Sequence, residues 1–494
     1  MVQQSSSQKV IARGAGSNAL SFVIRFAARA GFLYVGARLY GAANYGVFTM
    51  ASAMVELAVP VASLGLKRMI FPWLEEETAT GKLATHVLLD ALLLAMVAGL
   101  LVSLVMIGGV LLVPQGAVSD ALRLAIVLLA PSVLGQITGD IALAATRWTH
   151  KMRYEVIGRG LVEPYALTGV ALAAWHFGLQ DTGMLIGYWA GSIALAAFSV
   201  WSARHCLGSL HLRRWRPSPA ALLRRARALI PASGSDFLTT LAQRIDLYLV
   251  GFLLGDAPAG VYGVLRQLRT PILQVRQAFD GILTPLTART MRSDGDVVTG
   301  EATAAATRVV LTLQLGVVLL MAATGDLLLG LFGVRQPGAY AALLAMVLAE
   351  TVNGAFGVSE LILYYRRPAL ALQVNFVLIA IAALAIPLLT PDYGIVGATI
   401  AMLVAALFAA GLRRHWLVGL GVRPPLLHAS VPIAAASIAV LMGLQGATVL
   451  PTTWPAALRN AAPALIALAL YALFVAMWRK ARPGVLSLNR YRIS

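Results

Sequence analysis

The chain has 494 residues, of which 59% are hydrophobic and only 12% charged, and its mean hydropathy is +0.79. Soluble globular proteins carry about 25% charged residues, so a soluble fold of this length could not hide so much apolar surface. The apolar runs, such as residues 91–113 and 461–478, are nearly unbroken, whereas a transmembrane β-barrel shows short segments of alternating polarity. Because every backbone polar group needs a partner inside hydrocarbon, these runs predict an all-α polytopic membrane protein.

The net charge of +18 would suggest nucleic-acid binding in a soluble protein. In a membrane protein it has a simpler explanation, because Lys and Arg gather in short cytoplasmic loops. We therefore expect no nucleic-acid partner. The one cysteine, Cys206, excludes an internal disulfide framework. The polar N-terminal stretch MVQQSSSQKVIARGAG has no short apolar core, so no removable signal peptide is predicted.

Apolar segments separated by charged or Gly/Pro-containing breaks number about fourteen, each of the length that a bilayer requires. Basic residues collect in alternate loops, which predicts that both termini are cytoplasmic. After the fourth span, for example, the loop carries Arg147, Lys151, Arg153 and Arg159. The stretch from residue 36 to residue 70 is the hardest to divide. The expected span centres are Arg29, Met54, Met96, Leu128, Gly169, Ile193, Leu241, Gln274, Val317, Val347, Ile379, Val404, Ser437 and Ala467.

An internal repeat divides the chain. The segment LYGAANYGVF (residues 39–48) aligns with LLGDAPAGVY (residues 253–262), and each is a glycine-containing turn between two spans. A chance match between short Gly/Ala-rich strings is the alternative. The second copy lies where a duplicated six-span unit would restart, and transporters with repeated halves bind substrate between them. The predicted organisation is a cytoplasmic N-terminus (1–16), an N-lobe with spans one to six (17–203), a basic cytoplasmic linker (204–228), a C-lobe with spans seven to twelve (229–416), spans thirteen and fourteen (417–478) and a cytoplasmic tail (479–494).

Ionisable side chains within spans cost about 2.5 kcal/mol or more each, so they usually face an interior cavity or a partner. The eighth span carries three arginines and an aspartate within roughly 80° of one another on one side of a helix. A guanidinium stays charged and can donate two hydrogen bonds to a phosphate, so such a stripe is predicted to line a cavity that binds an anionic pyrophosphate or glycan. The alternatives are that some of these arginines reach the headgroups or pair with neighbouring carboxylates. The predicted substrate-binding residues are Arg25, Arg29, Arg244, Arg266, Arg269 and Arg276, and the candidate coupling-ion residues are Glu56, Asp236, Asp246 and Asp280.

Further acidic residues within or near spans are alternative coupling sites, although most are expected to be structural partners. The sequence shows no Walker-type phosphate loop, no paired-histidine metal motif and no Ser-His-Asp constellation. No cofactor and no metal is therefore expected, and the chain is not predicted to be an enzyme. The short predicted periplasmic loops disfavour a glycan polymerase or ligase, and a scaffold would not need buried arginines. The additional acidic candidates are Asp90, Asp140, Glu163, Asp326, Glu350 and Glu360.

Four segments covering most of the chain carry a family resemblance. They are RLYGAANYGVFTMASAMVELAVPVASLGLKR, DLYLVGFLLGDAPAGVYGVLRQLRTPILQVRQAF, ILTPLTARTM and PDYGIVGATIAM. Together they resemble the Wzx-type polysaccharide flippases of the multidrug/oligosaccharidyl-lipid/polysaccharide (MOP) exporter superfamily. The resemblance implies a MATE/MurJ-like fold with two six-helix lobes, two C-terminal helices and a central cavity that faces alternately in and out.

The resemblance also implies a function, which is the transfer of undecaprenyl-pyrophosphate-linked oligosaccharides across the bacterial inner membrane for O-antigen, capsule or exopolysaccharide synthesis. The expected partners are the lipid-linked oligosaccharide and membrane lipids, with glycan-assembly proteins as a further candidate. A lipid II flippase for peptidoglycan is the alternative. A multidrug exporter is disfavoured, because cationic drugs would call for acidic cavity residues.

Overall fold

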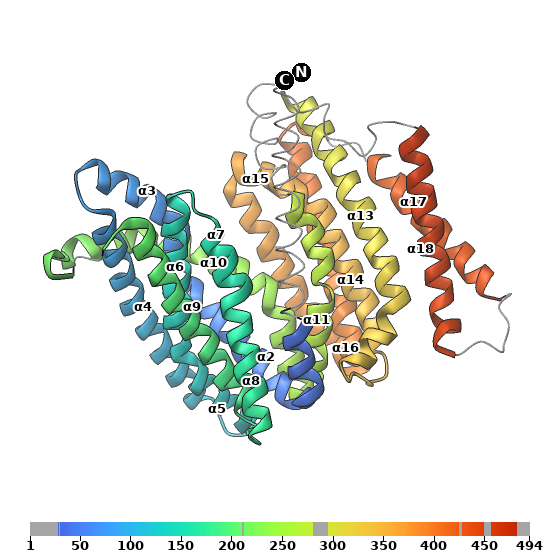
Figure 1. The fold of residues 1–494 in the computed structure, drawn as a ribbon. Helices are drawn as coiled ribbons and strands as arrows, with labels where there is room; N and C mark the ends of the chain where they lie inside the picture. The colour runs from blue at the N-terminus through green and yellow to red at the C-terminus, as the bar shows by residue number, and fades with distance from the viewer. Residues whose placement is uncertain are drawn as a thin grey trace, which may run out of the picture. The chain divides into compact units, whose positions relative to one another are not determined.

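The computed structural model describes residue 28 and residues 30–209, 212–279, 295–423, 427–448 and 456–481. Within these ranges the secondary structure is helical, without strands, and nine stretches are long and apolar enough to cross a membrane (Figure 1). One of them, α16 (Pro368–Gly419), contains a break at Gly394, whose φ of 55° and ψ of −138° are not helical. This helix therefore supplies two of the predicted spans. The all-α, polytopic prediction is confirmed.

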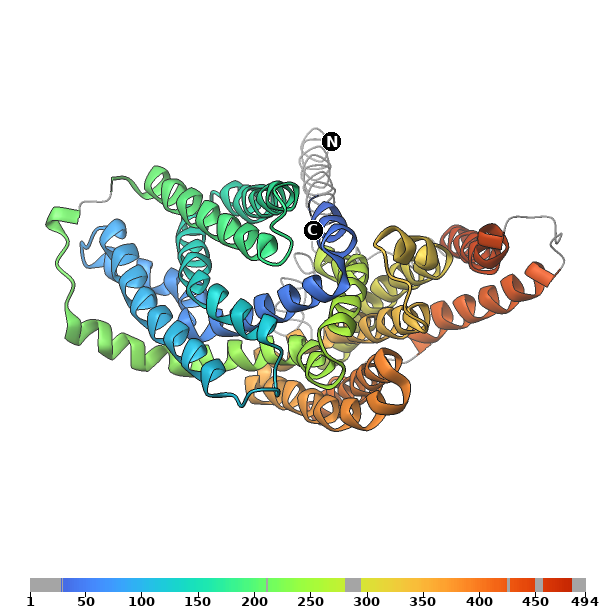
Figure 2. The ribbon, with the colours of Figure 1, turned by 90° about the horizontal axis from the view of Figure 1, so that it is seen from below.

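The chain forms two compact units, and the first consists of Met1–Arg244 and Gly255–Gly260. Only 22% of the most apolar window of its α4 is buried, so most side chains of this helix are free to face lipid. By contrast, α8 and α9 run side by side (Figures 1 and 2). The helices of this unit are η1 (Tyr34–Leu39), α2 (Gly41–Ala62), α3 (Leu66–Ala79), α4 (Ala84–Leu112), α5 (Asp120–Leu129), η2 (Ala130–Ser132), α6 (Val133–Trp148), α7 (Arg153–Ile157), η3 (Gly158–Val162), α8 (Glu163–His176), α9 (Gly183–Leu207), η4 (Leu212–Arg214) and most of α10 (Pro219–Leu254).

The short helix α3 was not predicted from the sequence, in which residues 36–70 were the hardest stretch to divide into spans. Two consecutive residues with positive φ separate α2 from α3, namely Leu64 at 52° and Gly65 at 70°. A left-handed leucine is uncommon, because its Cβ crowds the following carbonyl. The break lets α3 leave the direction of α2 and pack against α4 and α6.

The second unit consists of Ile245–Leu254 and Val261–Ser494. The last two helices pack on α13, where the Tyr471 hydroxyl donates a 3.0 Å hydrogen bond to the carbonyl of Thr312. Small residues of α17 and α18, such as Ala439 and Ala467, surround Leu319 of α13 in one apolar cluster. Besides the C-terminal part of α10, the helices are α11 (Asp256–Leu268, whose first residues belong to the first unit), α13 (Gly295–Leu331), α14 (Ala339–Phe356), η5 (Gly357–Ser359), α15 (Glu360–Arg366), α16, α17 (Leu427–Thr448) and α18 (Ala456–Ala481).

The two copies of the repeated segment share their backbone conformation. Gly41 and Gly255 hold the same place in the two copies, at the start of α2 and just before α11, and have φ of 82° and 88°. Such values are readily adopted only by glycine. Five residues further on, Gly46 and Gly260 touch each other's segments inside the first unit. A Cβ placed on Gly46 would lie 1.8 Å from the Asp256 carbonyl oxygen, and one on Gly260 would lie 1.9 Å from that of Ala42. The equivalence is therefore reciprocal, which favours a true repeat over a chance match.

Candidate functional site

In the second unit, Arg266 forms a buried ion pair with Asp246. Nη1 of Arg266 contacts Oδ1 of Asp246, and the two side chains are only 8% and 1% exposed. The other carboxylate oxygen of Asp246 accepts a 3.0 Å hydrogen bond from the Tyr262 hydroxyl. The backbone N–H of Leu247 donates to the same carboxylate at 2.9 Å. The carboxylate of Asp246 therefore accepts from three donors, which offset the cost of burying its charge.

Arg269 extends this group of charges. Its Nη1 lies 3.3 Å from Oε2 of Glu350 on α14, and the two side chains are 17% and 10% exposed. Arg269 also interacts electrostatically with Asp246. A row of alternating charges therefore runs from Arg266 through Asp246 and Arg269 to Glu350. Glu350 was one of the acidic residues expected to be a structural partner, and its pairing with Arg269 agrees with that expectation.

A second ion pair between an arginine and a carboxylate lies in the same unit. Arg413 of α16 places Nη2 3.6 Å from Oε2 of Glu360 and donates from Nη1 to the side-chain oxygen of Asn353 at 3.4 Å. Arg276 is close enough to Arg413 for their charges to repel each other. A Cβ placed on Gly357 would lie 2.9 Å from Nη1 of Arg276, so that glycine makes room for the guanidinium. Arg413 was not among the substrate-binding residues predicted from the sequence.

The eighth span is not one continuous helix. Helix α11 ends at Leu268, Arg269 lies in a turn, and residues 270–279 are helical again. Pro271 explains the interruption, because it lacks the N–H that would bond four residues back. The predicted single stripe is therefore wrong in this respect: Arg269 lies at the interruption, and Arg276 lies on a second helical segment.

In the first unit, Arg244 of α10 forms an ion pair with Glu56 of α2. Their side chains are 29% and 43% exposed, so this pair is far more accessible than that of Arg266. Asp236, also on α10, is half-buried. Arg25, Arg29 and Asp280 lie outside the described residues, so their predicted places in a cavity stay predictions.

A polar network in the first unit was missed from the sequence. Arg159 bridges two carboxylates, with Nη2 2.5 Å from Asp140 and Nη1 3.0 Å from Glu163. The same Nη1 donates to the side-chain oxygen of Gln136 at 2.8 Å. Nζ of Lys67 on α3 lies 3.2 Å from Asp140. Two cations and two anions therefore compensate one another between α3, α6 and α8.

The position of Arg159 had been read as a cytoplasmic loop, and the structure places it in the π-helix η3 instead. The signal that could have revealed this is its spacing from Glu163, because residues four apart share one helix face. A π-turn inserts an extra residue, which rotates the arginine toward α6, and such turns are frequent at functional sites.

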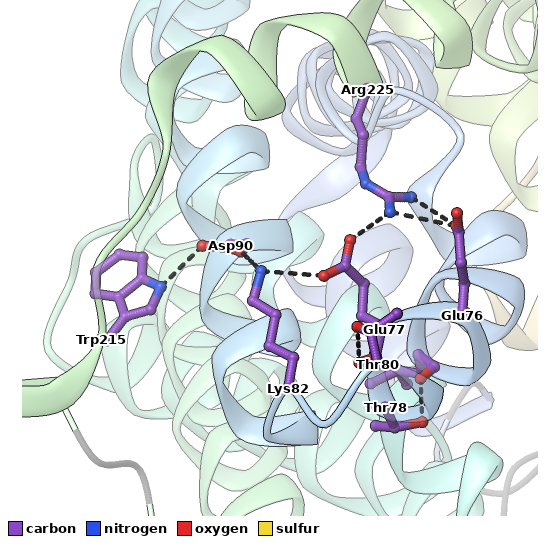
Figure 3. A network of polar contacts seen from close by, with 9 residues as sticks. Glu76, Glu77, Thr78, Thr80, Lys82, Asp90, Trp215 and Arg225 are labelled. Atoms are coloured by element: carbon purple, nitrogen blue, oxygen red, sulfur yellow. Dashed lines mark hydrogen bonds and ion pairs between the residues drawn. The ribbon is translucent and has the colours of Figure 1, made fainter.

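Within the first unit, the basic linker is held to the end of α3. Arg225 of α10 pairs with Glu77 at 2.5 Å and with Glu76 at 3.2 Å (Figure 3). Its guanidinium also lies 4.7 Å from the ring centroid of Trp73, a distance suited to a cation–π contact. One arginine of the linker is thus fixed by two carboxylates and an indole.

A second set of contacts joins the linker to α4. Nζ of Lys82 lies 2.6 Å from Asp90 and 3.4 Å from Glu77 (Figure 3). The Trp215 indole N–H donates to the other oxygen of Asp90 at 2.8 Å. We call the side chains Trp73, Glu76, Glu77, Lys82, Asp90, Trp215 and Arg225 the linker clasp.

Over residues 11–291 the chain matches the family described as polysaccharide biosynthesis protein. The chain belongs to this polysaccharide biosynthesis protein family. A search of curated proteins found no match. The structure of the lipid II flippase MurJ in an inward closed conformation aligns with a TM-score of 0.66 at 10% identity, over 94% of this chain and 98% of that one.

Two further solved structures have the same fold. An inward-facing multidrug resistance MATE family transporter of the MOP superfamily gives a TM-score of 0.62 at 14% identity, over 80% of this chain and 95% of that one. A MOP superfamily transporter from Pyrococcus furiosus, described as having a binding pocket of reverse polarity, gives 0.55 at 15% identity, over 80% and 94%. These alignments confirm the MATE/MurJ-like fold that the resemblance implied.

Among the residues that the structure describes, no group of three or more His, Cys, Asp or Glu side chains is placed to hold a metal ion. This family member does carry guanidinium groups, and those of Arg244, Arg266 and Arg269 are each paired with a carboxylate. Such groups can bind an anion if it replaces the carboxylate as the arginine's partner.

The ion pairs of the linker clasp contribute stability over a defined pH range. Burial opposes ionisation of Glu77, but the hydrogen bond from Arg225 and the nearby positive charges hold its pKa below the ordinary value of 4.5. Burial likewise opposes the charge on Lys82, yet the hydrogen bond and charge of Asp90 raise its pKa above 10.5. The Glu77 contribution is complete above pH 4.5 and is lost as the pH falls through its lowered pKa. The Lys82 contribution is complete below pH 10.5 and is lost as the pH rises through its raised pKa.

We expect Arg225→Gln to release the linker. The substitution removes two ion pairs and a cation–π contact, which together stabilise the docked linker by roughly 1–2 kcal/mol. Hydrogen exchange of residues 215–228 should become about tenfold faster or more. The neighbouring Arg224 is exposed, so Arg224→Gln is the matched control. Equal exchange rates in both variants would contradict the clasp.

Proposed function

We propose that this family member is a flippase that transfers undecaprenyl-pyrophosphate-linked oligosaccharides across the bacterial inner membrane by alternating access. The product would feed O-antigen, capsule or exopolysaccharide assembly, and both termini would face the cytoplasm. Its partners would be the lipid-linked oligosaccharide, membrane lipids and glycan-assembly proteins. The observation that carries the proposal is the row of charges in the second unit, in which Arg269 lies between Asp246 and Glu350.

The partial accessibility of Arg269 supports this assignment. Its side chain is 17% exposed against 8% for Arg266, and its closest carboxylate lies at 3.3 Å. A pyrophosphate, like a carboxylate, can accept two parallel hydrogen bonds from a guanidinium, so it can replace Glu350 as the partner of Arg269. Binding therefore takes the form of an exchange between two anions for one arginine. Loss of Arg269 removes the cation for which both compete.

Cells that lack their own copy of the gene and carry single variants provide the test. Arg269→Ala should reduce surface glycan by at least about tenfold, which corresponds to 1.4 kcal/mol in substrate binding. Arg269→Lys should restore export only in part, because an ammonium cannot donate in the bidentate manner of a guanidinium. Arg335 is exposed in a loop, so Arg335→Ala serves as the control. Wild-type export by Arg269→Ala cells would remove the proposed site.

If the carboxylate and the phosphate compete for Arg269, removing the carboxylate should strengthen phosphate binding. Glu350→Gln keeps the shape of the side chain but removes the competing charge, so the purified protein should bind inorganic pyrophosphate about tenfold more tightly. Isothermal titration in lipid nanodiscs measures this affinity. The exposed Glu301 on α13 supplies the control, since Glu301→Gln changes the net charge equally. Unchanged affinity in Glu350→Gln would mean that Glu350 does not compete with the ligand.

A lipid II flippase for peptidoglycan is the second candidate, because the MurJ structure aligns with 94% of this chain whereas the MATE transporter aligns with 80%. Both candidate substrates carry a pyrophosphate, so the arginine variants do not separate them. Growth separates them: loss of a lipid II flippase stops peptidoglycan synthesis, whereas loss of a surface-glycan flippase removes only that glycan. A multidrug exporter would instead need accessible carboxylates for cationic drugs, and Asp246 and Glu350 are occupied by arginines.

A further inference from the structure

An open depression of about 800 Å³ lies in the first unit, between α3 and the turn that follows α6. One face of α3 contributes Lys67, Phe71 and Glu75, which are spaced four residues apart. The other side is formed by the end of α6 and its turn. The complete lining is Lys67, Phe71, Glu75, Arg147, Trp148, His150 and Met152.

The charges that line the depression are largely compensated by carboxylates behind them. Lys67 lies 3.2 Å from Asp140, and Nε of Arg147 lies 3.4 Å from Glu155. Glu75 adds a carboxylate to the lining itself. An anion bound here would meet this carboxylate as well as the two cations, so the charges of the lining do not by themselves select an anion. The polar groups of the lining remain good hydrogen-bond partners, because an ammonium has three N–H donors and Lys67 is 47% exposed.

The lining combines two aromatic rings with separate donors and an acceptor. An apolar ligand would cover the Lys67 ammonium and the Glu75 carboxylate without bonding to their remaining donors and acceptors, which is costly. A free phosphate would meet the carboxylate of Glu75. A pyranose ring fits both requirements, because one face presents C–H groups to an aromatic ring while its hydroxyls both donate and accept. Trp148 and Phe71 supply the rings, and both are partly buried, so they are held in place but still reachable.

The depression is built on rigid supports. His150 has a φ of 60°, uncommon for a residue other than glycine, and its N–H donates to the Arg147 carbonyl at 2.8 Å. The Arg147 guanidinium lies 5.8 Å from the centroid of Phe71. On its other face α3 is fixed through Trp73 and Glu77 of the linker clasp. A preformed site of this kind binds without a large ordering cost.

We propose that this depression is a saccharide-binding site, which takes a pyranose residue stacked on Trp148 or Phe71 with its hydroxyls bonded to Lys67 and Glu75. The saccharide would be either the glycan head of the lipid-linked substrate, in which case the site rests on the proposed function, or a free sugar. The predicted orientation of the basic loops puts the depression on the cytoplasmic side, where a newly made glycan would first arrive.

Saturation-transfer NMR on the purified full chain in nanodiscs tests the site, with the methyl pyranosides of glucose, galactose and N-acetylglucosamine as probes. We expect binding of at least one probe, at least about tenfold weaker binding in Trp148→Ala, and weaker binding in Glu75→Gln, whose exposed position leaves the fold intact. Trp201 is 56% exposed outside the depression, so Trp201→Ala is the matched control. Absence of binding by every probe, equal loss in Trp201→Ala, or displacement of the sugar by inorganic pyrophosphate would overturn the proposal.

The glycan-export assay then distinguishes the two sources of the saccharide. Loss of export in Glu75→Gln cells would identify the glycan head of the transported substrate. Normal export together with lost sugar binding would identify a free saccharide. Glycoside binding in Arg269→Ala protein should equal that of the wild type, so a failure of the flippase proposal is seen separately from a failure of this site.

Discussion

Asp246→Leu is expected to destabilise the second unit by roughly 3–5 kcal/mol, because it leaves the guanidinium of Arg266 buried without its counter-charge. Arg266 and Asp246 are 8% and 1% exposed, so water cannot replace the lost partner. The Tyr262 hydroxyl loses its acceptor as well. Unfolding of the detergent-solubilised protein by added SDS, followed by circular dichroism, measures the loss.

The double variant Asp246→Leu with Arg266→Met separates a structural role from a binding role. Replacing both members of a buried ion pair by apolar residues of similar size is often nearly neutral, so most of the stability should return. If Arg266 serves only the fold, the double variant exports glycan normally. If Arg266 also binds substrate, the double variant is stable but inactive. A single variant as stable as the wild type would mean that the pair is not buried in the folded protein.

Much of the fold could be predicted from the sequence because a segment that crosses the bilayer must be a long apolar run. The predicted centres from Met54 to Ala467 fall in helices of the structure, including the two spans merged in α16. What was missed depends on backbone geometry that composition does not reveal. Helix α3 follows two residues with positive φ, and one of them is Leu64, which no propensity rule would place there.

The candidate site was less predictable for a different reason. Sequence spacing shows which arginines share a helix face, but a partner on another helix is set by packing. Glu350 and Arg269 are far apart in the sequence, and so are Arg159 and Asp140. The sequence therefore found cations within apolar helices and could only leave open whether carboxylates oppose them. For Arg244, Arg266 and Arg269 the structure supplies those carboxylates.

Gly46→Ala is expected to have a second large effect, because it inserts a methyl group where two backbones meet. A Cβ on Gly46 would lie 1.8 Å from the Asp256 carbonyl oxygen, about half of an ordinary carbon–oxygen contact. The obstructing atoms belong to the backbone, so no side chain can turn away and the two segments must separate. Small residues allow such close approach of membrane helices, and Ala42 lies four residues before Gly46 in this spacing. We expect a loss of roughly 1–3 kcal/mol in unfolding free energy.

The repeat also predicts how substitutions of these two glycines compare and combine. Gly260→Ala should cost about as much as Gly46→Ala, because each glycine faces the other's segment in the same way. The double variant should cost less than the sum, since segments already forced apart have room for the second methyl group. Gly108 in α4 has no neighbouring atom within 4 Å of a built Cβ, so Gly108→Ala is the control and should be neutral or slightly stabilising. Strictly additive losses in SDS unfolding would show that the two glycines do not share one contact, and the reciprocal packing of the repeated turns would then be wrong.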